Sequence, residues 1–361
     1  MMWQYELDKD CVFHRKDIKE APPRHVLIRP LLVGVCGTDK EICRGHREGI
    51  KYPLVIGHEI VAQVVNIAEE DGSNSLKIND RVVVFPNYWC DSCIDCKVGH
   101  FNTCKNKVSI GVNAPGALSE YMDVESKYLF KVPDSLSNYE AVLTEPLAVV
   151  IHAMKKIDPK PGDNILIIGG GALGHLTTML LLHELRDKVN IFIKEINIKK
   201  VHILREVFGD LVHILSSIYD YPLEFPYLNG LKIVDTVGNN SSISDIMSIS
   251  NILPSGIRSV ILGLGQKNVN IDLYAVVRRE IHIEGSIIYN PSDFINAIEI
   301  LYNMHKEKYE YLYRMPIIEI PLIKINDYFR ELINNDEVIK LIINPYGAEL
   351  RRFKLGSVVE G

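Results

Sequence analysis

The chain lacks the features that would place it among membrane, fibrous or nucleic-acid-binding proteins. It contains no apolar run near the roughly 18 residues that span a bilayer, and no internal repeat or low-complexity segment. Positive charge is not in excess, because the formal net charge is −6, so no nucleic-acid partner is expected. The first residues have neither the basic region nor the apolar core of a signal peptide. We therefore expect a cytoplasmic protein with no membrane partner.

Cysteine is also scarce, but four of the seven cysteines stand together. Cys90, Cys93, Cys96 and Cys104 are spaced C-x2-C-x2-C-x7-C. In a reducing compartment such a cluster is typical of metal ligands. Four thiolates fill the tetrahedral shell of zinc, so the pattern predicts a structural zinc site, with a disulfide pair as the less favoured alternative. The other cysteines are Cys11, Cys36 and Cys43.

The first 135 residues have the pattern of an all-β domain. Short apolar-rich runs separated by turn residues predict strands at 25–35, 60–67 and 82–85. Good helix formers then dominate residues 139–156, which predicts one helix there. A chain of 361 residues is too long for one ordinary core. We predict two domains, one from residues 1–150 with 290–361 and the other from residues 151–289.

The second domain alternates predicted strands and helices, which indicates a doubly wound parallel sheet. Its first strand, 164–168, is entirely apolar apart from Asn164 and leads into a glycine-rich turn. Further strands are predicted in this domain at 190–195, 232–238, 258–265 and 280–285, and a helix at 175–185. In the part of the chain that returns to the first domain, helices are predicted at 292–305 and 325–334 and a last strand at 339–343. Residues 346–361 are expected to form a solvated extension.

The turn after the first of these strands has the pattern of a dinucleotide-binding loop. Gly169, Gly171 and Gly174 form G-x-G-x-x-G between a predicted strand and a predicted helix. Such glycines allow a tight turn and a close approach of backbone N–H groups to a pyrophosphate. Together with Leu173 they are the candidate coenzyme residues of this loop. Glu195, 21 positions after Gly174, can bind both ribose hydroxyls and would repel a 2′-phosphate, which favours NAD over NADP.

A second group of residues has the composition of a catalytic metal site. Cys36 and the pair His58-Glu59 lie in turns beside predicted strands, and Glu145 lies within the helix predicted at 139–156. A catalytic zinc takes about three protein ligands and leaves one position for water or substrate. A zinc ion acts as a Lewis acid on an alcohol oxygen. The spacing alone does not decide whether Glu59 or Glu145 supplies the third ligand.

Taken together, these motifs resemble the zinc-dependent medium-chain dehydrogenase/reductase family, with its GroES-like catalytic domain and Rossmann coenzyme domain. The resemblance rests on Cys-Gly-Thr-Asp, Gly-His-Glu, the four-cysteine lobe, Thr-Glu-Pro-Leu, the glycine pattern and Asp-x-Val-Gly, in that order along residues 20–345. It implies that Cys36 and His58 bind a catalytic zinc with Glu59 or Glu145 as the third position. It further implies that Asp39 accepts a hydrogen bond from His58 and that Thr38 begins a proton relay.

Within that family, Glu145 resembles the polyol and sugar branch. The resemblance therefore implies hydride transfer between NAD and a secondary alcohol of a polyol, sugar or cyclitol, by a homo-oligomer, either a dimer or a tetramer. Glu41, which stands where related enzymes often carry histidine, is a candidate for binding sugar hydroxyls or a solvent-facing charge. The alternatives are an L-threonine 3-dehydrogenase, a simple alcohol dehydrogenase, a zinc-free reductase and a non-enzymatic zinc-binding nucleotide sensor.

Overall fold

The computed structural model describes residues 1–19, 22–69, 75–221, 231–253, 255–335 and 337–359. The chain divides into two compact units. The first unit comprises Met1–Glu145 with Asn290–Gly361, and the second comprises Pro146–Tyr289. Within the described residues, no helix is both long enough and apolar enough to cross a membrane.

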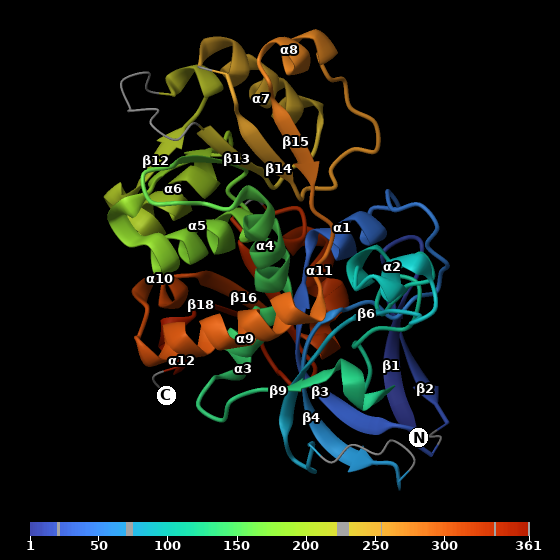
Figure 1. Cartoon of the computed structure of the whole chain (residues 1–361). Helices are drawn as coiled ribbons and strands as arrows, with labels where there is room; N and C mark the ends of the chain where they lie inside the picture. Colours follow the sequence, from blue (N-terminus) through green and yellow to red (C-terminus); the bar gives the residue numbers. More distant parts are fainter. Residues whose placement is uncertain (20–21, 70–74, 222–230, 254, 336, 360–361) are drawn as a thin grey trace. The chain divides into compact units, whose positions relative to one another are not determined.

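An eight-stranded sheet forms the centre of the first unit (Figure 1). Seven strands run in the order β18-β16-β17-β3-β4-β5-β9, and β8 also pairs with β3. Burial alternates along the first six residues of β3, so every second side chain there points into the core, and the last four residues are all buried. The strands are β3 (Val26–Val35), β4 (Glu59–Ile67), β5 (Arg81–Val84), β8 (Met122–Val124), β9 (Leu129–Lys131), β16 (Pro316–Pro321), β17 (Lys340–Asn344) and β18 (Arg351–Lys354).

A hairpin, a small cysteine lobe and several helices complete this unit. The hairpin joins β1 (Met2–Leu7) and β2 (Phe13–Ile18), and the lobe lies beside the two-residue pair β6 (Asn87–Tyr88) and β7 (Val108–Ser109). The helices are α1 (Gly37–Cys43), α2 (Ile94–Lys97), α3 (Asn138–Ala141), α9 (Pro291–Lys306), α10 (Glu310–Tyr313), α11 (Ile325–Leu332) and α12 (Gly356–Val359). Short 3-10 turns lie at η2 (Phe101–Thr103), η3 (Ser126–Tyr128) and η7 (Leu322–Lys324).

The second unit is built on a six-stranded parallel sheet of order β12-β11-β10-β13-β14-β15. Its strands are β10 (Asn164–Ile168), β11 (Asn190–Lys194), β12 (Val212–Leu215), β13 (Leu231–Asp235), β14 (Arg258–Ile261) and β15 (His282–Gly285). Its helices are α5 (Ala172–Leu185), α6 (Ile198–Phe208), α7 (Asn240–Ile252) and α8 (Leu273–Arg278), while α4 (Thr144–Ile157) begins at the end of the first unit. The strand order reverses between β10 and β13, which is where such sheets bind dinucleotides.

Both predicted architectures, a mostly β domain and a doubly wound parallel sheet, are confirmed. Two local predictions were wrong. The helix predicted over 139–156 is interrupted, because α3 ends at Ala141 and α4 begins at Thr144. Most of the tail is folded rather than extended: β18 pairs antiparallel with β16, and α12 follows it, while residues 360–361 lie outside the described residues.

Candidate functional site

Cys36 lies where β3 passes into α1, at the first unit's candidate metal site. The residue caps the N-terminus of α1: its sulfur accepts from the backbone N–H of Thr38 at 3.1 Å. Its own N–H donates to the carboxylate of Asp39 at 3.0 Å. This capping box fixes the cysteine between strand and helix. The sulfur is therefore held by local backbone geometry as well as by its neighbours.

His58 immediately precedes β4 and faces Cys36. Its Nε2 lies 2.9 Å from the sulfur of Cys36, and its Nδ1 lies 3.6 Å from Asp39 Oδ1. One ligand atom from each of these three residues falls within 4.8 Å of the others. Asp39 and His58 are buried. The structure thus brings together two of the predicted zinc ligands and the aspartate expected to support them.

The charges around His58 favour a cation at this position. Burial lowers the pKa of His58, but the negative charges of Cys36, Asp39 and Glu145 and the hydrogen bond to Cys36 raise it well above its ordinary value. A thiolate, an imidazole and carboxylates that together stabilise a proton would also stabilise Zn²⁺, whose protein ligands are of these kinds. The residues present therefore fit a zinc ion.

The two candidate glutamates have different surroundings. Glu145, in the first turn of α4, is buried and close enough to affect the pKa of His58. Glu59, the first residue of β4, is also buried, and its carboxylate forms an ion pair with the Nζ atom of Lys340. A Cβ atom on Gly34 would lie 1.9 Å from the Glu59 carboxylate, so this pairing needs glycine there. Lys340 was not predicted; a lysine within an otherwise apolar strand is the signal that could have revealed it.

Thr38 and Glu41 lie on α1 with different contacts. Thr38 is half-buried and adjoins the cluster through its backbone N–H. The carboxylate of Glu41 is held by Arg44 at 2.8 Å and by His46 Nδ1 at 3.1 Å. Because both oxygens of Glu41 already have cationic or polar partners, the solvent-facing alternative fits this residue better than sugar binding.

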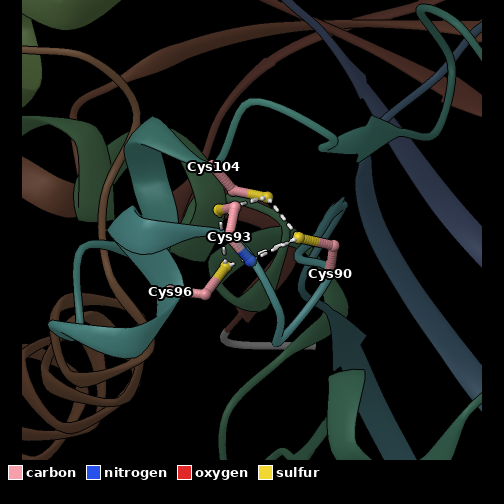
Figure 2. Close-up of side chains that lie close together, drawn as sticks. All are labelled: Cys90, Cys93, Cys96 and Cys104. Atoms are coloured by element: carbon pink, nitrogen blue, oxygen red, sulfur yellow. Dashed lines mark hydrogen bonds between the residues drawn. The ribbon is translucent and has the colours of Figure 1, made fainter.

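The four clustered cysteines have the geometry of a tetrahedral metal site (Figure 2). The sulfur–sulfur distances are 3.5 Å for Cys93–Cys96 and Cys90–Cys104, 3.8 Å for Cys93–Cys104 and 4.0 Å for Cys90–Cys96. A tetrahedron with metal–sulfur bonds of about 2.3 Å has edges of about 3.8 Å. A disulfide would need about 2.05 Å. The donor set and spacing therefore fit a structural zinc ion.

Local hydrogen bonds prepare one of these sulfurs for metal binding. The hydroxyl of Ser92 donates to Cys90 at 3.4 Å, as does the N–H of Cys93 at 3.4 Å. The Ser92 side chain and backbone, followed by the Cys93 N–H, lower the pKa of Cys90 to about 5. These hydrogen bonds favour the thiolate form of Cys90, which is the form that binds metal.

In the second unit, β10 leads into the glycine-rich turn and α5. A Cβ atom on Gly174 would lie 2.0 Å from the carbonyl oxygen of Gly169, so helix and turn can pack this closely only with glycine. Gly171 caps α5, and Leu173 is its second residue. This arrangement presents the helix N-terminus beside the loop, as pyrophosphate binding requires.

Glu195 follows β11 directly and is buried against that turn. One carboxylate oxygen accepts from the N–H of Gly170 and the other from the N–H of Asn197, both at 2.8 Å. Each oxygen retains a further lone pair. Glu195 can therefore fix the loop and still accept from ribose hydroxyls.

A GroES-like unit with a Cys–His–Asp cluster and a four-cysteine lobe, joined to a dinucleotide-type sheet, defines a zinc-type dehydrogenase. Residues 22–134 match the family model of the alcohol dehydrogenase GroES-like domain. The match covers part of the first unit, and curated dehydrogenases are similar to this chain along most of its length.

Several relatives act on sugar acids. The chain is 27% identical over 321 residues to 2-dehydro-3-deoxy-L-galactonate 5-dehydrogenase of Pseudoalteromonas atlantica, covering 86% of this chain and 89% of that protein. It is 26% identical to L-galactonate-5-dehydrogenase of Escherichia coli, covering 93% and 96%. L-threonine 3-dehydrogenases are also among the relatives. The fold is similar to that of an alcohol dehydrogenase (rspB) of Escherichia coli solved with NADH, with a TM-score of 0.79, 23% identity and coverage of 95% and 99%.

Proposed function

We propose that the chain is an NAD-dependent zinc dehydrogenase that oxidises a secondary alcohol of a polyol, sugar, sugar acid or cyclitol. The observation that carries this proposal is the cluster of Cys36, Asp39 and His58, in which a thiolate, a carboxylate and an imidazole lie within 4.8 Å of one another. When bound, zinc supplies Lewis acidity to the alcohol oxygen, and NAD supplies the hydride acceptor.

The residues around the cluster have separate roles in this proposal. Cys36 Sγ and His58 Nε2 hold the metal. Asp39 Oδ1 lies 3.6 Å from His58 Nδ1, so the expected hydrogen bond between them is not formed here; such a bond would leave Nε2 for the metal. Thr38 accepts the proton that the alcohol loses, at its hydroxyl oxygen, and passes it on toward solvent.

For the third metal ligand, the surroundings favour Glu145 over Glu59. The carboxylate of Glu59 is neutralised by Lys340, and both side chains are 1% exposed. Glu145 adds negative charge at His58 instead. We infer that Glu145 completes the shell, directly or through water, and that Glu59 is held by Lys340.

The other predicted sites complete the proposal. Cys90, Cys93, Cys96 and Cys104 hold a structural zinc, and the first unit is the catalytic domain. The second unit binds NAD through the turn at Gly169, Gly171, Leu173 and Gly174, with Glu195 at the adenosine ribose. The turn joins the end of β10 directly to the start of α5, and this position supports the assignment.

The substrate class rests on the charge of the site and on the relatives. A site that holds the buried carboxylates of Asp39 and Glu145 suits an apolar alcohol poorly, because removing water from a carboxylate is costly. Neighbouring hydroxyls of a polyol can donate charge-assisted hydrogen bonds to such a carboxylate. The sugar-acid relatives point the same way.

A substrate panel with NAD tests the proposal. The panel contains sorbitol, xylitol, glucose, galactose, myo-inositol, L-galactonate, threonine, ethanol and benzyl alcohol, compared by kcat/KM. We expect a polyhydroxylated compound to lead. If threonine or ethanol led, the zinc dehydrogenase assignment would survive without the polyol class.

Zinc content after dialysis should be two per chain in the wild type and one per chain in Cys36→Ala. No loss of zinc in that variant would contradict the catalytic zinc site.

We further propose a cytoplasmic homo-oligomer. A group of apolar side chains between residues 264 and 277 is exposed on the second unit, and β15 is the edge strand of its sheet. An exposed apolar surface beside an unpaired sheet edge is typical of a self-association surface.

A further inference from the structure

Cys11 and Cys43 form a disulfide that belongs to neither metal cluster. Cys11 lies in the turn between β1 and β2, and Cys43 is the last residue of α1. Their Cα atoms are 4.8 Å apart, and 32 positions separate them in the sequence. The side chains are only 8% and 7% exposed. The bond therefore ties the end of α1 to a hairpin turn that is remote in sequence.

The turn that carries Cys11 is held in place by several hydrogen bonds. Asp8 accepts from the N–H groups of Asp10 and Val12, both at 2.9 Å, and Cys11 adopts a positive φ of 59°. Two residues farther on, Phe13 exchanges two hydrogen bonds of 2.8 Å with the side chain of Asn326 on α11. The guanidinium of Arg330 on the same helix donates to the carbonyl oxygen of Asp10. The turn is thus a fixed anchor.

The other end of the bond is on the helix that bears the candidate active site. Helix α1 has only seven residues, with Cys36 capping its start and Cys43 ending it. A displacement of so short a helix at one end reaches Thr38 and Asp39 at the other. Outside the disulfide, the end of the helix is held by Tyr52, whose hydroxyl donates to Ile42, and by Arg44, which donates to Asn334.

A cavity beside the anchor is lined in part by Cys11, one of the two cysteines of the bond. It has a volume of about 120 Å³ and is lined by Cys11, Val12, Phe13, Ile325, Asn326, Phe329 and Arg330. The guanidinium of Arg330 lines this cavity and favours the binding of an anionic molecule there. A small thiol with carboxylate groups, such as a glutathione-type tripeptide, matches both the position of Cys11 and this charge.

We propose that Cys11–Cys43 is a reversible thiol–disulfide switch that sets the order of α1 and, through it, the activity of the metal site. This inference rests on the proposed dehydrogenase function. A thiolate RS⁻ attacks Cys11, the S–S bond breaks, and Cys43 leaves as a thiolate. A second RS⁻ then releases Cys11, so that the protein disulfide and two RSH give the dithiol and RSSR, a two-electron reduction. A small disulfide RSSR reverses the reaction.

The expected consequence is that the oxidised form holds α1 in place and the reduced form lets its end move. In cytosolic proteins, disulfides are usually catalytic or redox-sensing rather than structural, which agrees with a switch. Reduction is then expected to lower kcat/KM about fivefold or more, the lower end of typical coupling between two sites. Reduction is also expected to speed the loss of zinc from the Cys36–His58 site.

The test uses the zinc-loaded full chain, equilibrated in glutathione buffers of defined ratio. Alkylation followed by mass spectrometry reports the Cys11 and Cys43 thiols. Zinc release to 4-(2-pyridylazo)resorcinol, compared with that of Cys36→Ala, which should keep only the zinc of the four-cysteine lobe, reports the Cys36–His58 site without any substrate, and kcat/KM reports activity. The matched control is the double variant Cys11→Ser/Cys43→Ser, which should resemble the reduced form and ignore the buffer.

Equal zinc-release rates and equal kcat/KM in both redox states would overturn the proposal. So would an equal response of the double variant, or a bond that glutathione leaves intact in the folded protein. If no polyol were oxidised, the proposed function would fail on the panel, while zinc release and thiol trapping would still decide the switch.

Discussion

Glu59 and Glu145 share a side chain type and a buried position, yet their partners give them different roles. Glu59 is paired with a buried cation, so its charge is cancelled inside the fold. Glu145 adds to the negative charge around His58, where a metal would compensate it. From the sequence alone, these two carboxylates have equal standing as candidate ligands. The ion pair with Lys340 distinguishes Glu59 from Glu145.

Lys340→Met should be strongly destabilising. The substitution keeps most of the buried volume but leaves the Glu59 charge unpaired, which typically costs about 3–5 kcal/mol. The measurement is the free energy of unfolding in urea. The double variant Lys340→Met/Glu59→Gln should recover much of the loss, because it removes the unpaired charge. A single variant as stable as the wild type would show that the pair is not needed.

Glu195→Ala should weaken NAD binding and relax the preference over NADP. The substitution removes the acceptor for ribose hydroxyls and also the partner of the Gly170 N–H, whose loss alone costs about 1–3 kcal/mol. We expect the Kd for NAD to rise about tenfold, equivalent to about 1.4 kcal/mol. Nicotinamide fluorescence titrations of NADH and NADPH measure both affinities. Tighter NADPH than NADH binding by the wild type would refute the preference.

Part of the site was not predictable because it depends on contacts between residues that lie far apart in the sequence. Glu59 and Lys340 lie 281 positions apart, and nothing in the local pattern of either residue specifies the other. The same holds for Cys11 and Cys43, whose pairing needs the β1–β2 turn to be placed against α1. In contrast, the proximity of the candidate ligands Cys36 and His58 was predictable, because each stands in a motif whose neighbours constrain it.

Elements with strong periodicity or apolar runs were predicted well, and those fixed by tertiary contacts were not. Strands β10 and β11 are uniformly apolar at their centres, so their buried parallel pairing follows from composition. The break before Thr144 follows from Pro146, which has no N–H to donate to the carbonyl of Val142 and therefore stands in the first turn of a new helix. Strand β18 is rich in cations, and only its pairing with β16, where Arg351 approaches buried Glu319, makes it a strand.

Helix α5 carries a buried histidine that should make the second unit sensitive to acid. Burial lowers the pKa of His175 to about 4, and Lys200 adds to this, against hydrogen bonds with Gly171 and Gly170. Because the folded pKa lies below the ordinary 6.5, the unfolded chain binds the proton more readily. The contribution of neutral His175 to the free energy of unfolding is complete above pH 6.5. It falls as the pH drops toward 4, by about 3 kcal/mol in total.

His175→Leu should therefore lose less stability than the wild type between pH 6.5 and 4. Urea unfolding at a series of pH values, followed by a probe in the second unit, measures the difference between the two proteins. Comparing the variant with the wild type removes the acid response of the metal ligands, which both share. Parallel curves over this range would show that His175 is not the titrating group.

The cysteine lobe should depend on its metal more than on its own packing. Helix α2 has four residues and η2 has three, too few to form a core. Cys93→Ser should remove one zinc per chain and lower the Tm by roughly 5–10 °C, since each kcal/mol corresponds to about 2–4 °C in a domain of this size. Cys36→Ser is the comparison, because it should remove the other zinc with a smaller change in Tm. Unchanged zinc content in Cys93→Ser would rule out this site.

At the scale of the whole molecule, charge and exposed apolar surface govern association. The formal net charge of −6 gives a modest mutual repulsion between copies. Against it stands an apolar group on the second unit, in which Leu273, Tyr274 and Val277 of α8 are each at least 70% exposed. Side chains of this size seldom gather in contact with water unless another surface covers them.

Val277→Glu combined with Leu273→Glu should therefore dissociate the proposed homo-oligomer. Two carboxylates from each copy would meet across the contact, and burying unpaired charges is costly. Light scattering after size exclusion measures the mass, and circular dichroism checks that the fold is kept. Ile323→Glu is the matched control, because Ile323 is 73% exposed but belongs to the first unit. We expect a monomer of about 40.9 kDa for the double variant and the wild-type mass for the control. A wild type that is already monomeric, or a double variant that keeps its assembly, would show that this surface serves another purpose.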